Sequence, residues 1–382
     1  MQALEPLRKR LKHRETGEDC NFVVPYGVHA PVALVEEESS WLRLEHGIEV
    51  AQAGADASLP PPSRHFADSG LPPHVVVAVE ALVGPAPTPV QMQVLPSILQ
   101  GRDVVCIAPT GSGKTLAYLA PLVALQTTQP TPLALTGLVL APTRELMEQI
   151  FRVCVALLGA NAEGATLTCT TPTTRVAGIC GGLPLGPQLH ALQDGVDIII
   201  ATPGRLLHIV DDHAFSLAAL RYLVLDEVDR MIDFEAPLVA LLRACNPVAR
   251  QTIVCSATLP SAVECIVRSA VLNPITVKVM PTLSKAPPVT HRCTVTSSKL
   301  QWLLQTLRRD VPRPPVLVFC NAAATVWKTA HGRAGLCCTC VTYTDSRSTV
   351  SAIGSYVQSL GQQIPVAMTA VSRFSDNGNN AN

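Results

Sequence analysis

Short apolar runs alternate with segments of helical periodicity through the middle of the chain. Five segments each contain an unbroken apolar run, at residues 103–108, 137–142, 196–202, 221–227 and 251–258. Runs of this length are typical of parallel strands that are buried on both faces. Between them, residues 144–158 and 261–272 have apolar positions at helical spacing. This alternation predicts an α/β fold in which helices cover both faces of a mostly parallel sheet.

The pattern divides the chain into four parts. Residues 1–64 have weak periodicity and end near a proline-rich stretch, so we expect an N-terminal extension with short local structure. Residues 65–280 carry the strand and helix alternation and form the main predicted domain. Three prolines within residues 281–290 indicate a linker. A second α/β segment follows at residues 291–382.

The second segment is predicted in less detail than the first. Its pattern favours a strand at residues 291–297, a helix at 299–309 and another strand at 314–320. Residues 322–382 contain only two acidic residues, are rich in Ala, Thr, Ser and Val, and predict no order of elements. A usual second domain of about 150 residues would need more chain than this segment provides. We therefore expect a partial second domain.

The charge balance limits how the chain could bind nucleic acid. It has 29 basic and 29 acidic residues, which argues against binding through bulk positive charge. A local groove that uses backbone amides and a few arginines remains possible. The basic stretch RKRLKHR at residues 8–14 is either a solvated tail, a nuclear signal or a nucleic-acid contact. Hydrophobic residues make up 48% of the chain, so a fully disordered protein is excluded.

The cysteines indicate a reducing compartment. Thirteen are scattered without a repeating spacing, so we interpret them as reduced thiols and expect an intracellular protein of the nucleus or cytoplasm. No apolar run is long enough to cross a bilayer, so no membrane association is expected. The cluster CCTC at residues 337–340 could suggest a metal site, but its short spacing is unsuited to one tetrahedral zinc ion.

The sequence APTGSGKT, residues 108–115, lies between an apolar run and a helical segment. Its glycines allow the loop to curl so that successive backbone N–H groups point at phosphate oxygens, and the helix N-terminus favours an anion. Lys114 would reach the β- and γ-phosphates, and the Thr115 hydroxyl would bind Mg²⁺. The strict pattern has glycine where Ala108 stands. The alternative to a phosphate-binding loop is an ordinary turn between a strand and a helix.

The sequence LVLDEVD, residues 223–229, places two adjacent carboxylates at the end of a predicted strand. Asp226 can hold Mg²⁺ directly or through water. Glu227 is placed to orient or deprotonate an attacking water. Two acids after an apolar strand could alternatively be a solvated strand end. The phosphate loop upstream in the same domain favours the metal and water roles.

These residues resemble the DEAD-box RNA helicases of superfamily 2, with DEVD where the family has DEAD. The loop at 108–115 is similar to the family's own phosphate loop, which commonly begins with alanine. Other similar segments follow in the family's order: Phe66, PTPVQ at 87–91, PTREL at 142–146, Gly181 with Gly182, TPGR at 202–205, SAT at 256–258 and VLVFCN at 316–321. The ordered set is much more specific than any one motif.

The resemblance implies a fold, ligands and an activity. The fold would be a RecA-like parallel sheet with helices on both faces, plus a partial second RecA-like domain. ATP and Mg²⁺ would be the cofactors, and RNA, as a single strand or short duplex, would be held through its backbone. The activity would be RNA-stimulated ATP hydrolysis coupled to local strand separation. We expect a monomer, and the sequence indicates no protein partner.

The resemblance and the residue types together assign four groups of site residues. The catalytic group is Lys114, Asp226, Glu227, Ser256 and Thr258. The cofactor-binding group is Phe66, Gln91, Ala108, Pro109, Thr110, Gly111, Ser112, Gly113, Lys114 and Thr115. The metal ligands are Thr115 and Asp226. The RNA-binding group is Pro142, Thr143, Arg144, Gly181, Gly182, Thr202, Pro203, Gly204 and Arg205.

Some of these residues have a specific expected contact. The amide of Gln91 can donate and accept, which suits the edge of adenine. Ser256 and Thr258 would bond to the DEVD carboxylates and couple the nucleotide to the RNA groove, although SAT alone could be only a strand end. Thr143 could also be the N-cap of a helix, and that role is compatible with an RNA contact. Backbone contacts of this kind position RNA without reading its sequence.

Three features depart from the family's pattern. Gly84 lies near the position where the family has an aromatic residue that stacks on adenine, so Phe66 alone would shape that pocket or nucleotide affinity would fall. Val228 replaces the alanine of DEAD and adds two methyl groups, which a buried strand end accepts. Residues 322–382 contain neither A-T-D-x-x-x-R-G nor H-R-x-G-R, the motifs whose arginines reach the γ-phosphate.

Three functions are compatible with these features to different degrees. The leading hypothesis is an ATP-dependent RNA helicase whose turnover is impaired in this chain by the loss of the second-domain motifs. The alternative is a catalytically silent regulatory protein that binds ATP and RNA. An unrelated P-loop enzyme, such as a small-molecule kinase, gives no reason for PTREL, TPGR and SAT in this order.

Overall fold

The computed structural model describes residues 34–52, 59–128, 135–160, 167–172, 174–213, 215–245, 250–280, 290–295 and 336–341. Its contacts divide the chain into two units, Met1–Thr282 and Leu283–Asn382. The boundary lies inside the predicted linker. The basic stretch at 8–14, the predicted helix at 299–309 and the segment at 316–321 lie outside the described residues.

A nine-stranded sheet forms the centre of the first unit, in the order β1-β9-β2-β8-β7-β3-β6-β5-β4. The strands are β1 (Ile48–Gln52), β2 (Val104–Ile107), β3 (Gly137–Leu140), β4 (Thr168–Thr170), β5 (Arg175–Ile179), β6 (Ile198–Ala201), β7 (Tyr222–Leu225), β8 (Gln251–Ser256) and β9 (Ile275–Val279). Neighbouring strands pair in parallel except at the two edges, where β1 runs antiparallel to β9 and β4 to β5. The predicted, mostly parallel α/β sheet is confirmed.

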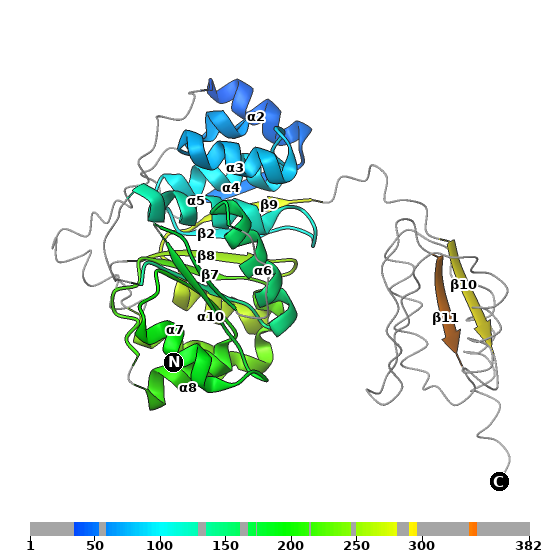
Figure 1. Cartoon of the computed structure of the whole chain (residues 1–382). Helices are drawn as coiled ribbons and strands as arrows, with labels where there is room; N and C mark the ends of the chain where they lie inside the picture. Colours follow the sequence, from blue (N-terminus) through cyan, green and yellow to red (C-terminus); the bar gives the residue numbers. More distant parts are fainter. Residues whose placement is uncertain are drawn as a thin grey trace, which may run out of the picture. The chain divides into compact units, whose positions relative to one another are not determined.

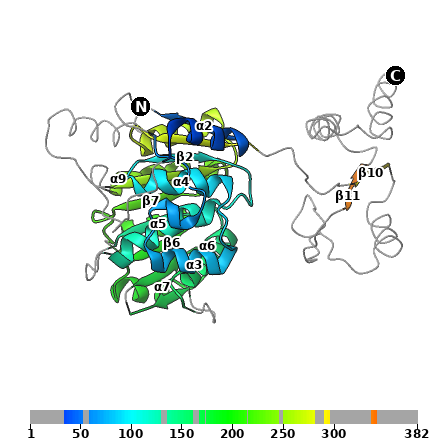
Figure 2. The same cartoon turned by 90° about the horizontal axis from the view of Figure 1, so that it is seen from above.

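Helices cover both faces of this sheet. They are α2 (Glu36–Glu45), α3 (Pro73–Val83), α4 (Pro89–Leu99), α5 (Lys114–Thr128), α6 (Arg144–Leu157), α7 (Leu185–Gln193), α8 (Pro203–Asp212), α9 (Glu235–Ala244) and α10 (Ser261–Ala270), with short 3₁₀ turns η2 (Phe66–Ser69), η3 (Val228–Arg230) and η4 (Ile232–Phe234). Figure 1 shows α3, α4 and α5 on one face and α8 and α10 on the other. Figure 2 shows α3, α4, α5 and α6 spread over the same face.

Alternate residues of each central strand belong to different hydrophobic cores. On β2, Val104 and Cys106 pack in the core under α3 to α6, whereas Val105 packs in the core under α8 to α10. This two-sided burial explains why the strands are apolar without polar alternation. The residues predicted as helices at 144–158 and 261–272 form α6 and α10. No helix in the described part of the chain is long and apolar enough to span a membrane.

Part of the predicted N-terminal extension belongs to the sheet. The strand β1 pairs with β9 from Ile48 opposite Val279 to Gln52 opposite Ile275. In α2, the buried Arg43 side chain donates hydrogen bonds to the side chain of Gln93 at 2.9 Å and to a backbone carbonyl at 2.9 Å. Residues 36–52 therefore fold together with the main domain.

The described part of the second unit is a parallel pair of strands, β10 (Thr290–Val295) and β11 (Leu336–Val341). The first of them overlaps the strand predicted at 291–297. The second contains the CCTC sequence at 337–340, where the sequence predicts no element. A search of the described residues finds no group of three or more His, Cys, Asp or Glu that could hold a metal ion.

Asp103 ties the central strands together at the beginning of β2. Its carboxylate accepts hydrogen bonds from the backbone N–H of Thr252 at 2.9 Å and of Leu272 at 2.6 Å. Its own backbone carbonyl accepts from Ile275 at 2.8 Å. Asp103 is 5% exposed, so both backbone donors would be costly to leave unpaired.

We expect Asp103→Asn to destabilise the fold by about 1–3 kcal/mol, because an amide offers one acceptor oxygen where two buried N–H groups need partners. Urea unfolding measures the loss. The control is Asp68→Asn, whose carboxylate accepts one exposed backbone bond from His65 at 3.2 Å and should cost less than about 0.5 kcal/mol. Equal unfolding midpoints for the two variants would contradict this account of Asp103.

Candidate functional site

The sheet brings six of the predicted motifs of the first unit to one edge. The phosphate loop follows β2, SAT ends β8 and DEVD follows β7, and these strands are neighbours in the order β2-β8-β7. PTREL follows β3, TPGR follows β6 and the paired glycines follow β5, and these strands are neighbours in the order β3-β6-β5. The carboxyl ends of parallel strands meet at one edge, where ligands of such sheets bind. The predicted nucleotide and RNA motifs therefore form two adjacent groups.

The phosphate loop is curled and the side chain of its lysine is directed into it. Gly111 and Gly113 have positive φ angles of 77° and 91°, which other residues rarely adopt. The ammonium group of Lys114 donates to the carbonyl oxygens of Ala108 at 2.6 Å and Pro109 at 3.1 Å. Lys114 is 7% exposed. Its charge therefore lies inside the loop, where a phosphate oxygen could replace a carbonyl as its partner.

The residues before the loop brace it from α4. Thr88 is the N-cap of α4, and its hydroxyl donates to the carbonyl of Ser112 at 2.8 Å. The side-chain amide of Gln91 donates to the carbonyl of Gly113 at 3.1 Å and accepts from the backbone N–H of Thr88 at 2.9 Å. A Cβ atom at Gly113 would lie 2.7 Å from the Gln91 amide nitrogen. The loop and the amide are therefore closely fitted to each other.

Two expectations about the adenine side change with this geometry. Gln91 is 1% exposed and its side-chain amide donates to the phosphate loop. In this structure the amide therefore supports the loop and is not exposed for hydrogen bonds to the edge of adenine. Phe66 is also 1% exposed and packs in the core with residues of α3 and α4, so it does not shape a nucleotide pocket in this structure. An apolar side chain in that sequence position can equally be a core residue.

The carboxylate of Asp226 is buried and held at both oxygens. It is 3% exposed, and its Oδ2 atom accepts from the phenol of Tyr118 at 2.7 Å. Its Oδ1 atom accepts from the backbone N–H of Glu227 at 2.9 Å. Burial raises the pKa of this carboxyl, and the bond from Tyr118 opposes the rise. The sequence reasoning missed Tyr118, although its position four residues after Lys114 puts it on the same face of α5.

Glu227 begins η3 in a strained conformation. Its φ and ψ angles are both 49°, in the left-handed region that costs a residue with a side chain roughly 1–3 kcal/mol. Its carboxylate pairs with the guanidinium of Arg230 at 2.8 Å, and the Glu227 side chain is 16% exposed. Val228, the departure from DEAD, is buried in the core under α8 to α10 and needs no open space. Strain of this kind clusters at active sites.

The SAT motif contacts DEVD through one residue rather than two. The backbone N–H and hydroxyl of Thr258 both donate to one carboxylate oxygen of Asp229, at 3.1 Å and 2.9 Å. The hydroxyl of Ser256 instead donates to the backbone carbonyl of Thr258, so the expected bond from Ser256 to a DEVD carboxylate is not formed. Ser256 meets the phosphate loop through its backbone, since its carbonyl accepts from Ala108 at 3.0 Å. Thr258 therefore makes the expected bond to a DEVD carboxylate, and that carboxylate belongs to Asp229.

The predicted metal ligands fit a hard divalent cation. Thr115 and Asp226 supply hydroxyl and carboxylate oxygens, the donor type that Mg²⁺ prefers. Asp226 accepts from the phenol of Tyr118 on α5, and Thr115 precedes Tyr118 by three residues in the same helix. Residues at this spacing lie on the same face of a helix, so Thr115 is on the face of α5 that carries the partner of Asp226.

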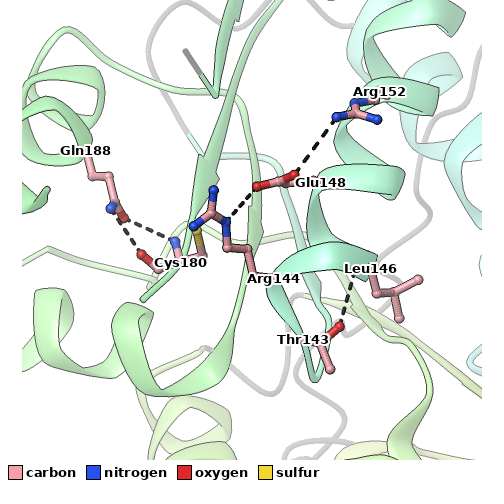
Figure 3. Close-up of polar contacts among 7 residues, drawn as sticks. All are labelled: Thr143, Arg144, Leu146, Glu148, Arg152, Cys180 and Gln188. Carbon is pink, nitrogen blue, oxygen red and sulfur yellow. Dashed lines mark hydrogen bonds and ion pairs between the residues drawn. The ribbon is translucent and has the colours of Figure 1, made fainter. Parts of the chain in front are cut away.

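The predicted RNA residues of α6 lie at its N-terminus. The hydroxyl of Thr143 accepts from the backbone N–H of Leu146 at 3.3 Å, so Thr143 is the N-cap. The guanidinium of Arg144 pairs with Glu148 at 2.7 Å, and Arg152 pairs with the same carboxylate at 4.0 Å from the other side (Figure 3). The side chain of Arg144 is 45% exposed, so a phosphate could reach it.

A buried glutamine holds the paired-glycine segment after β5. The side-chain amide of Gln188 donates to the carbonyls of Cys180 and Pro184, both at 3.1 Å, and accepts from the N–H of Cys180 at 3.1 Å (Figure 3). Gln188 is 6% exposed. It fixes both ends of the turn that contains Gly181 and Gly182. Sequence reasoning missed this residue, because a single glutamine eight residues after Cys180 belongs to no recognisable motif.

The TPGR segment, residues 202–205, forms the beginning of α8, and the space beside the Gly204 backbone is open. Thr202 is the N-cap without a side-chain capping bond, and Pro203 occupies the first turn. A Cβ atom at Gly204 would meet nothing within 4 Å. Arg205 donates to the carbonyl of Leu183 at 3.2 Å, which links this segment to the paired-glycine turn. Helix N-termini of this kind present backbone N–H groups that suit phosphates.

Comparison with known proteins agrees with the motif order. The model of the DEAD/DEAH box helicase family matches residues 88–266. The chain is 36% identical over 306 residues to DEAD-box ATP-dependent RNA helicase 14 of Arabidopsis thaliana, covering 78% of this chain and 46% of that relative. It is 41% identical over 246 residues to DEAD-box ATP-dependent RNA helicase 20 of Oryza sativa subsp. japonica, covering 63% and 47%. This chain thus spans about half the length of these curated relatives.

Solved structures of similar fold are also helicases. The crystal structure of the RNA-helicase Prp28 from Chaetomium thermophilum bound to ADP matches with a TM-score of 0.55 and 31% identity, covering 76% of this chain and 67% of that one. The yeast DEAD-box splicing factor Prp28 matches with a TM-score of 0.59 over 91% of this chain and 97% of that one; at 20% identity it supports the RecA-like fold alone. This chain therefore belongs to the DEAD-box RNA helicase family, with DEVD at residues 226–229 in place of DEAD.

Proposed function

We propose that this protein is an ATP-dependent RNA helicase whose first unit binds ATP with Mg²⁺ beside the backbone of an RNA strand. The observation that carries the proposal is the order of the strand ends. The nucleotide motifs over β2-β8-β7 adjoin the RNA motifs over β3-β6-β5 along one edge of the sheet. A single sheet edge can therefore hold both ligands next to each other.

The nucleotide half of the site, at the ends of β2, β8 and β7, has the groups that phosphoryl transfer needs. Lys114 would exchange the carbonyls of Ala108 and Pro109 for β- and γ-phosphate oxygens. Thr115 and Asp226 would hold Mg²⁺, which supplies positive charge against the charge that develops on the phosphates. Glu227 would orient the attacking water and take its proton. The left-handed backbone of Glu227 supports a functional role, since strain of this kind clusters at active sites.

The RNA half of the site, at the ends of β3, β6 and β5, has donors suited to a sugar–phosphate backbone. The guanidinium groups of Arg144 and Arg205, the hydroxyl of Thr202 and backbone N–H groups at Gly182 and Gly204 would contact phosphates. These groups position RNA and carry no direct sequence readout. The RNA would therefore be recognised as a single strand or short duplex, whatever its sequence. This fits a chain of zero net charge that uses a local groove.

We further propose that turnover by residues 1–382 alone is weak. An arginine that reaches the γ-phosphate is worth about three to five powers of ten in rate for related chemistry. Residues 322–382 contain neither of the family's arginine-bearing motifs. The same observation favours the second candidate function, a catalytically silent protein that binds ATP and RNA. We also propose a monomer located inside the cell, in the nucleus or cytoplasm.

We expect RNA-stimulated ATP hydrolysis that Lys114→Ala abolishes, because that variant loses the cation facing the phosphates. Phosphate release is measured with and without single-stranded RNA. Glu227→Gln should retain nucleotide affinity but lose hydrolysis by at least about a hundredfold, since the amide cannot accept a proton. Nucleotide binding without turnover in the unaltered chain would favour the silent protein. Loss of binding in Glu227→Gln would contradict the role of Glu227.

The brace of the phosphate loop generates a second prediction. Thr88→Val keeps the shape of the side chain but removes the hydrogen bond to Ser112, so nucleotide affinity should fall about fivefold, as for one bond of about 1 kcal/mol. Thr143→Val is the matched control, because it removes the same kind of N-cap from α6, away from the loop. Affinity is measured without RNA by fluorescence of an ADP analogue. An equal fall in the two variants would contradict the brace.

The RNA half gives a third prediction on α6. Arg144→Gln should weaken RNA binding and lower the slope of log affinity against log salt by about 0.7–1, because one phosphate contact is lost. Arg152→Gln is the control, since Arg152 shares the partner Glu148 but lies two turns, roughly 12 Å, farther along the helix. Fluorescence anisotropy with labelled single-stranded RNA at several salt concentrations measures both. An unchanged slope for Arg144→Gln would remove this residue from the RNA contacts.

A further inference from the structure

The phenol of Tyr118 contacts a residue assigned to the metal. Its O–H donates to Oδ2 of Asp226 at 2.7 Å. Thr115, the last residue of the phosphate loop, precedes Tyr118 by three residues in α5, so both lie on the same face of that helix. Tyr118 therefore joins the helix that follows the phosphate loop to the first residue of DEVD.

This connection is rigid because Tyr118 itself is fixed. The side chain is fully buried, in the core under α3 to α6. The hydroxyl of Tyr222 on β7 donates to the backbone carbonyl of Tyr118 at 2.8 Å. That bond ties the middle of α5 to the strand that carries DEVD. A buried aromatic ring with its backbone held in this way has little freedom to turn away from Asp226.

Both oxygens of the Asp226 carboxylate have a donor. Oδ2 accepts from the phenol, and Oδ1 accepts from the backbone N–H of Glu227 at 2.9 Å. A buried carboxylate that lost one of these bonds would be less restrained and would be poorly compensated for its lost hydration. The simpler interpretation of Tyr118 is a buried phenol that has found an acceptor. That role would affect stability and leave the Mg²⁺ dependence of nucleotide binding unchanged.

We propose that Tyr118 is a positioning residue for Mg²⁺, whose phenol fixes the Asp226 carboxylate in place before metal and nucleotide bind. This inference rests on the proposed ATP–Mg²⁺ site. Partners that orient metal ligands through hydrogen bonds typically contribute about ten- to a hundredfold to metal affinity. Phenylalanine would keep the ring and remove only this function. The backbone bond from Tyr222 would stay.

The experiment titrates Mg²⁺ against binding of a fluorescent ADP analogue to the full chain, with EDTA as the metal-free reference. Tyr118→Phe should raise the Mg²⁺ concentration for half-maximal binding about tenfold and leave the affinity in EDTA unchanged. Ser269→Ala is the control, because it also removes one buried hydroxyl whose bond is to a backbone carbonyl, on α10 on the other face of the sheet. Its Mg²⁺ midpoint should equal that of the unaltered chain. Binding of Mn²⁺, followed by electron paramagnetic resonance, should show the same tenfold loss in Tyr118→Phe alone.

The outcomes separate this inference from the proposed function. If the unaltered chain binds the ADP analogue equally in Mg²⁺ and EDTA, the proposed metal site itself is wrong. If it shows the Mg²⁺ dependence and Tyr118→Phe has the same midpoint, the positioning role is overturned and the site stands. A parallel loss of affinity in Mg²⁺ and EDTA, with a lower melting temperature, would show a structural phenol and would also overturn the proposal. A shifted midpoint confined to Tyr118→Phe supports it.

Discussion

Parallel pairing of strands that are buried on both faces is the constraint from which the rest of this structure follows. Such strands carry few polar side chains along their length, because both cores need apolar residues. Polar groups therefore gather mainly where the strands end, and the parallel direction puts those ends at one edge. The order β2-β8-β7-β3-β6-β5 then decides which loops are neighbours. The nucleotide and RNA motifs adjoin because of this order, although all three RNA motifs lie between the phosphate loop and DEVD in the sequence.

The polar groups at this edge are already tied to one another without a ligand. Thr88 and Gln91 hold the phosphate loop from α4, and Tyr118 holds Asp226 from α5. Thr258 holds Asp229 from β8. Each tie joins elements far apart in the sequence, so the site cannot form before the sheet does. A preformed site loses less conformational entropy when a nucleotide binds.

The sequence was sufficient for some features and not for others, for physical reasons. The central strands and α6 could be predicted because burial on two faces or on one helical face leaves a strong local pattern. The edge strand β1 could not, since it is only five residues long and its partner β9 lies more than 200 residues away. Motif spacing located Lys114 and Asp226. It could not locate Tyr118 or Gln188, whose roles depend on tertiary contacts, and it gave no sign that Phe66 is buried in the core.

Hydrogen bonds join the phosphate loop to the DEVD segment through the end of β8. SAT ends β8, which lies between the phosphate-loop strand β2 and the DEVD strand β7. The backbone N–H of Ala108 donates to the carbonyl of Ser256. The hydroxyl of Ser256 donates to the carbonyl of Thr258, and Thr258 holds Asp229 with two donors. Asp229 lies in η3, directly after β7, and β7 borders β3, whose end begins the RNA motifs. These bonds therefore connect the phosphate loop to the segment that follows the strand next to the RNA motifs.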